Sequence, residues 1–161
     1  MIQSSQGWTL EEINRGIAKL KRRIGELQVL LDTQVKYEDP LVRNAELEIP
    51  TTIEDVFGEE SREYEEYSYV RLRSEILSKS AHETAPAAEQ RNQSEFIHRV
   101  HEIMVRLQGL VKRLEEKKED FKKCPICHRT YPNFDYCLED GTFLVSLSYD
   151  PDSPTLSQHD N

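Results

Sequence analysis

Three cysteines and one aspartate near the end of the sequence have the spacing of a metal site. Two residues separate Cys124 from Cys127, and nine more separate Cys127 from Cys137. Two thiolates in a C-x2-C pair can reach one Zn²⁺ from a tight turn, because the backbone amides of that turn also point at the sulfurs. Asp140 stands where a four-thiolate site would have its last cysteine. Carboxylate is an accepted zinc ligand, so these residues predict one structural zinc ion.

The fourth ligand of this site has several candidates. Asp140 is the first, His128 directly after the C-x2-C pair is the second, and solvent or His159 is a third. The dipeptide Asp140-Gly141 is also typical of a tight turn in which the carboxylate accepts hydrogen bonds from nearby amides, and this role is compatible with metal binding. The cysteines also have a purely structural interpretation as small buried hydrophobes. Disulfides are not expected, because the cysteine count is odd and no secretory signal is recognisable.

Other residues between the C-x2-C pair and Leu144 extend the motif. The pair reads CPIC, a Tyr131-Pro132 turn follows, and an aromatic residue, Tyr136, precedes the third cysteine of C-x-x-D-G-x-x-L. This pattern resembles the short single-zinc ribbons that are appended to many prokaryotic proteins. The resemblance covers 21 of the 161 residues and implies a fold and a metal, not an activity. The sequence departs from it at His128, where such ribbons usually have a small residue, often glycine.

Composition and charge favour an elongated helical protein. Charged residues make up 32% of the sequence and glycines number only 6. Eleven acidic and two basic residues between Glu38 and Glu66 account for the net charge of −9, so the rest of the chain sums to zero. No stretch of 18 apolar residues predicts a membrane span. The first seven residues have neither the charged nor the apolar part of a secretory signal, and we therefore expect a cytoplasmic protein.

A heptad pattern predicts a long first helix over residues 10–32. Thr9 and Glu12 have the positions of a capping box, and apolar residues recur at alternating spacings of three and four: Leu10, Ile13, Ile17, Leu20, Ile24, Leu27 and Leu31. Such a row is one seam of a helical bundle or of an intermolecular coiled coil. Gly16 and Gly25 lie inside this helix, where each costs up to about 1 kcal/mol relative to alanine.

The middle of the sequence predicts shorter elements. Two X-Pro steps make residues 37–50 a connection, a capped short helix follows over 52–57, and a third helix covers 61–80. Residues 79–88 form a polar linker. After residue 147, the stretch 148–161 is polar and without periodicity, so it is expected to be disordered.

A second heptad pattern predicts a long last helix over about 90–122. One apolar row passes through Phe96, Val100, Ile103, Leu107, Leu110 and Leu114, and a parallel row through Ile97, Met104 and Val111. Two rows are more than one partner helix covers, which favours a homodimer or another protein partner. The expected fold is mainly α: an antiparallel helical bundle or coiled coil over 1–122, with a zinc ribbon over 123–147 held at the end of the last helix.

Three classes of function compete. The first is a non-catalytic interaction or adaptor protein that presents the ribbon to a partner. This class accounts for both heptad patterns and for the predicted zinc site. Nucleic-acid binding requires a positive surface, and the charges of the ribbon cancel. Arg91 and His98 have the R-x(4–6)-H spacing that resembles HEPN ribonucleases, which would imply a joint action of both on a scissile phosphate; one such match is expected by chance in this sequence. We therefore expect no enzyme.

Overall fold

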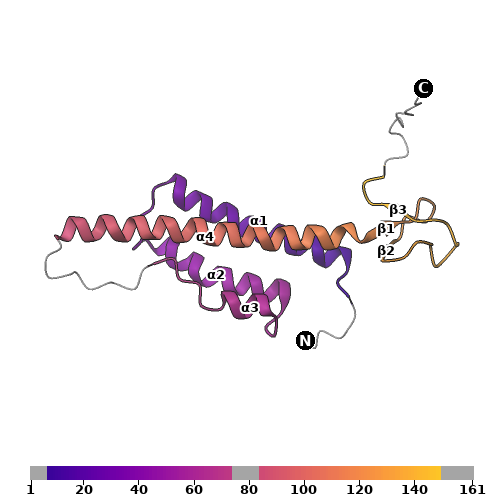
Figure 1. Ribbon diagram of the computed structural model, residues 1–161, viewed down its shortest axis with the longest axis horizontal. Helices are drawn as coiled ribbons and strands as arrows, with labels where there is room; N and C mark the ends of the chain where they lie inside the picture. Colours follow the sequence, from indigo (N-terminus) through magenta and orange to yellow (C-terminus); the bar gives the residue numbers. More distant parts are fainter. Residues whose placement is uncertain (1–6, 74–83, 150–161) are drawn as a thin grey trace, which may run out of the picture. The chain divides into compact units, whose positions relative to one another are not determined.

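The computed structural model describes residues 7–73 and 84–149 and is mainly helical, as expected (Figure 1). The chain divides into two compact units, Met1–Glu115 and Glu116–Asn161. Within the described residues, the first unit contains α1 (Leu10–Asp32), α2 (Pro40–Phe57), α3 (Arg62–Tyr67) and most of α4 (Ala85–Glu119). None of these helices carries an apolar stretch that could cross a bilayer.

The second unit contains a small antiparallel sheet. Its strands are β1 (Phe121–Lys123), β2 (Thr130–Pro132) and β3 (Val145–Ser146), in the order β2-β1-β3. Lys122 pairs with Tyr131 on one side and with Ser146 on the other, so β1 is the central strand.

Helix α1 begins at a complete capping box. The Thr9 hydroxyl accepts a hydrogen bond from the Glu12 amide (3.2 Å), and the Glu12 carboxylate accepts one from the Thr9 amide (2.8 Å). Two otherwise unpaired amides at the helix start are therefore satisfied. The helix spans the range that the heptad pattern predicts, and its buried face consists of Ile13, Gly16, Leu20, Leu27 and Leu30.

Gly16 marks the point where three helices meet. A Cβ atom placed on this glycine would lie 3.0 Å from Val56 Cγ1 of α2 and 3.1 Å from Leu114 Cδ1 of α4. Ion pairs fix the helix directions: Lys21 contacts Glu115 at 2.8 Å and Lys36 contacts Glu89 at 3.1 Å, so α1 runs antiparallel to α4 (Figure 1). By contrast, Gly25 is exposed and has open space around it. Only the first of the two glycines is thus required by packing.

Helix α2 is longer than the sequence predicts. The prediction of a connection over 37–50 and a helix over 52–57 is wrong, because both prolines are accommodated within one helix. Pro40 occupies the first turn, where an amide hydrogen is not needed, and Asp39 caps that turn by accepting from the Leu41 amide (2.9 Å). Pro50 lies in the helix interior, where burial of Ile49 and Ile53 on both sides of it outweighs the lost hydrogen bond.

Helix α3 is shorter than predicted. It is capped by Ser61, whose hydroxyl accepts from the Tyr64 amide (3.0 Å), and it ends at Tyr67 rather than continuing to residue 80. Residues 68–73 are not helical, and 74–80 lie outside the described residues. The carboxylate of Glu46 explains the change, since it accepts from the amides of Leu72 (2.8 Å) and Arg73 (2.9 Å) and holds this segment against α2.

Helix α4 begins at Ala85, earlier than predicted, and Pro86 is tolerated there because it stands in the first turn. Its first apolar row is buried. Of the second row, Met104 and Val111 are also buried within the chain, and Ile97 is 40% exposed. The row that favoured a second subunit is therefore largely covered inside one chain, and self-association stays a prediction.

We predict opposite effects for one substitution at the two glycines of α1. Gly25→Leu should stabilise the protein by up to about 1 kcal/mol, because leucine is a far better helix former and meets no neighbour. Gly16→Leu should destabilise it by about 1–3 kcal/mol through overpacking against Val56 and Leu114. Urea denaturation followed by circular dichroism measures both, and equal stability of the two variants would contradict the three-helix contact.

Candidate metal centre

Two hairpins bring the sequence-predicted ligands together. The first joins β1 to β2, and its turn is closed by hydrogen bonds from the Cys124 amide to the Arg129 carbonyl (2.9 Å) and from the His128 amide to the Cys124 carbonyl (3.0 Å). The second runs from Tyr136 to Phe143, which form a β-bridge. Inside it the Cys137 amide donates to the Thr142 carbonyl (2.7 Å). Backbone hydrogen bonds thus fix the positions of Cys124 and Cys137, and Cys127 lies inside the turn that the first hairpin closes.

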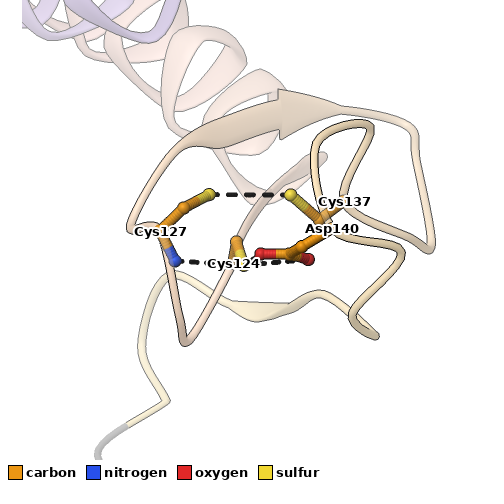
Figure 2. A group of neighbouring side chains, drawn as sticks. All are labelled: Cys124, Cys127, Cys137 and Asp140. Carbon is orange, nitrogen blue, oxygen red and sulfur yellow. Dashed lines mark hydrogen bonds between the residues drawn. The ribbon is translucent and has the colours of Figure 1, made fainter.

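Four potential ligand atoms converge between these hairpins (Figure 2). One atom each from Cys124, Cys127, Cys137 and Asp140 lies within 4.8 Å of all the others. The Cys127 and Cys137 sulfurs are 3.6 Å apart, and the Cys124 sulfur lies 3.6 Å from Asp140 Oδ2. Among the described residues, this is the group whose donor atoms are close enough to hold a metal ion.

Backbone amides of the first turn point at a sulfur, as the C-x2-C spacing predicts. Both the Ile126 and the Cys127 amides lie 3.4 Å from the Cys124 sulfur. The turn thus directs two backbone donors at the sulfur of its first cysteine, as expected for a metal-binding C-x2-C turn. Cys124 and Cys137 are buried, whereas Cys127 is exposed.

Asp140 combines two roles through its two oxygens. Oδ1 accepts a hydrogen bond from the Thr142 amide (2.8 Å), which forms the tight turn that ends with Gly141 at a φ of 73°. Oδ2 is the oxygen nearer to the Cys124 sulfur. Two hydrogen bonds from Thr142 lower the pKa of the Asp140 carboxyl. The one from the side chain has the larger effect, and the one from the backbone amide has the smaller. The turn therefore holds an ionised carboxylate with one oxygen directed at the cluster.

Tyr131 supports the cluster in a way that the sequence did not predict. Its hydroxyl lies 3.6 Å from the Cys137 sulfur. This hydrogen bond, together with burial, raises the pKa of Tyr131 to about 12. Burial of the Cys137 thiol opposes its ionisation, but hydrogen bonds from Tyr131 and from the Glu139 and Asp140 amides outweigh it and lower the pKa of Cys137. The prediction of a turn at Tyr131-Pro132 is wrong, because both residues lie in β2, where pairing of Tyr131 with Lys122 brings its hydroxyl to Cys137.

His128 occupies a different place from the four ligand candidates. It is exposed, its backbone has a φ of 62°, and it does not belong to the converging group. A left-handed backbone explains why glycine suits this position in a C-x2-C turn, and histidine is one of the residues that tolerates it. His159, the third candidate, lies outside the described residues. The geometry thus favours Asp140 as the fourth donor.

The donor set fits a divalent cation. Three thiolates and one carboxylate within 4.8 Å of one another repel each other strongly when ionised, and a bound dication would offset much of that repulsion. Four donors around one point also suit tetrahedral coordination. The four residues can therefore close the coordination shell of one metal ion without a solvent ligand.

Arg91 and His98, the nuclease candidates, both lie on α4. His98 is exposed and lines a shallow hollow with Tyr69, Glu95 and Glu102, whereas Arg91 is half-buried outside the lining of that hollow. Comparisons of the chain with models of known families, with curated proteins and with solved structures find no match.

We predict that three substitutions separate the two candidates for the fourth ligand. Asp140→Asn keeps an oxygen for the Thr142 amide but removes the negative charge, so zinc affinity should fall by at least about tenfold. Asp140→Cys completes a four-thiolate set and should preserve affinity. His128→Gly removes the imidazole and relieves the positive φ, so affinity should be unchanged or higher.

Competition with a chromophoric chelator measures these affinities on the reduced full-length chain. If His128→Gly lowers the zinc affinity and Asp140→Asn leaves it unchanged, the fourth ligand is His128 and not Asp140.

Proposed function

We propose that this chain is a non-catalytic zinc-binding interaction protein, in which a helical bundle carries a structural zinc ribbon that a protein partner binds. The observation that carries the proposal is the convergence of three thiols and one carboxylate within 4.8 Å. Thiolate-rich sets of this kind select soft or borderline ions, among which Zn²⁺ suits a tetrahedral set of three sulfurs and one oxygen.

The completeness of the donor set supports a structural role for the metal. Catalytic zinc sites keep one position for water or substrate, whereas structural sites use four protein ligands. Here Cys124, Cys127, Cys137 and Asp140 supply four donors. A substrate would have to displace a protein ligand, which argues for stabilisation of the ribbon and against catalysis.

The charges of the ribbon support a protein partner over a nucleic acid. Lys122 is ion-paired with Asp135, and Arg129 is ion-paired with Glu139. Phosphate binding depends on basic side chains that are available to neutralise phosphates. Two of the ribbon's basic side chains are already engaged by carboxylates of the same unit. Self-association through the helices has less support, because Met104 and Val111 are already buried within the chain.

Metal analysis of the full chain tests the proposal. Protein purified without chelator should contain about one zinc per chain, because one set of four donors is present. Cys127→Ser should lose the metal and the order of residues 121–146, while the helical circular dichroism signal is retained. The matched control is Ile126→Ser, which changes the same turn without removing a donor.

Two results would contradict the proposal. One is a zinc content near zero in reduced, folded protein. The other is a Cys127→Ser variant that keeps its metal.

A further inference from the structure

The ribbon exposes more large apolar side chains than it buries. Its buried cluster consists of Cys124, Cys137 and Leu144, with Tyr131 packed against it. Five large apolar residues are between 44% and 67% exposed: Ile126, Phe134, Tyr136, Leu138 and Phe143. Exposed apolar side chains at this density in a small unit are typical of a binding surface.

Three of these residues belong to the second hairpin and define what we call the hairpin patch: Tyr136, Leu138 and Phe143. Tyr136 and Phe143 face each other across the β-bridge, with ring centroids 5.0 Å apart in an edge-to-face arrangement. Their chain neighbours Cys137 and Leu144 are buried. Since side chains alternate along a strand, the aromatic pair lies on the face opposite the metal cluster. Leu138 is exposed in the turn of the same hairpin.

The charges around the hairpin patch restrict its partner. Asp135 and Glu139, the acidic residues beside it, are neutralised by Lys122 and Arg129. Three thiolates and one carboxylate around a dication would leave a net charge of about −2, and Lys123, directly before Cys124, reduces the total to about −1. The patch is therefore apolar in a weakly negative field. Such a field repels phosphates and attracts a basic group.

We propose that the hairpin patch is a docking surface for a short apolar protein segment flanked by basic residues. This inference rests on the proposed structural zinc function, because the metal holds the hairpin in place and sets the sign of its field. The same patch is poorly suited to a second copy of the chain, which would bring two negative clusters together.

The size of the patch also favours a short segment. Aromatic side chains contribute about 150–250 Å² each when buried. At the observed exposures, the three residues offer on the order of 300 Å². A stable protein interface needs about 800 Å² from each partner, so a dimer built on this patch alone would be weak. A short segment that lays a few apolar side chains on Tyr136, Leu138 and Phe143 would cover an area of this size.

Two synthetic peptides provide the test. Both carry the same row of leucines, and the remaining positions are lysines in one and glutamates in the other. With zinc-loaded full-length chain, fluorescence anisotropy should show tighter binding of the lysine peptide. The double variant Tyr136→Ser, Phe143→Ser should weaken that binding by at least about tenfold, as expected for two central aromatic contacts.

The matched control removes a similar apolar area elsewhere. Leu41→Ser with Leu47→Ser, at two exposed positions of α2, should leave binding unchanged. The zinc content of each variant reports whether the ribbon is intact. If the aromatic double variant loses zinc, the single variant Leu138→Ser takes its place and should weaken binding in the same direction.

Several outcomes would overturn the inference. The patch and control variants could bind the lysine peptide equally well, or the glutamate peptide could bind as tightly or more tightly. The chain could also bind a thymidine oligonucleotide, or form a dimer, in a way that the patch variant abolishes. A wild-type chain without zinc would instead overturn the proposed function. If the protein contains zinc but the patch variant binds the peptide as tightly as the wild-type chain does, only this inference is overturned.

Discussion

Four negatively ionisable side chains are held within 4.8 Å of one another, and the ribbon depends on what neutralises them. The buried cluster of this unit is built on two cysteines and one leucine, too few to stabilise independent strands by apolar burial. Strands of two or three residues supply little more. A bound metal ion would convert the repulsion of these four groups into the main stabilising interaction of the unit. On this account, metal coordination explains three features of the unit. These are its tight turns, the two amides that point at the Cys124 sulfur, and the Asp140 carboxylate, which binds the Thr142 amide through one oxygen and faces the cluster with the other.

The helical unit is stabilised differently, by close packing and by polar anchors. The absence of a side chain at Gly16 lets α1 approach Val56 and Leu114. Glu46, whose side chain is mostly buried, accepts hydrogen bonds from the amides of Leu72 and Arg73 and pairs with the Arg73 guanidinium (3.0 Å). Buried polar groups of this kind must be satisfied, and here they hold a non-helical segment in place. These contacts involve none of the four candidate metal ligands, so we expect removal of a metal to affect the second unit and to leave the helical unit folded.

The features that could be predicted from the sequence are those with strong local signals. The heptads of α1 and α4 and the capping box at Thr9 have periodic or positional signatures, and the C-x2-C pair has a metal-ligand spacing. The prediction failed where tertiary burial overrides a local rule. The Ile49-Pro50 step predicts a helix break, yet the buried Ile49 and Ile53 keep α2 continuous. Glu46, 26 residues before Leu72 in the sequence, binds the segment that follows α3 and holds it in a non-helical conformation. The contact of Tyr131 with Cys137 likewise depends on the pairing of β1 with β2.

The coordination shell itself is the most direct test of the central claim. Zinc-edge X-ray absorption of the purified full-length chain should fit three sulfur atoms at about 2.3 Å and one oxygen at about 2.0–2.2 Å, without an imidazole contribution. That result would assign the ion to the three cysteines and Asp140. An imidazole signal, a fifth light ligand or a shell with fewer than three sulfurs would contradict a closed structural site of this composition.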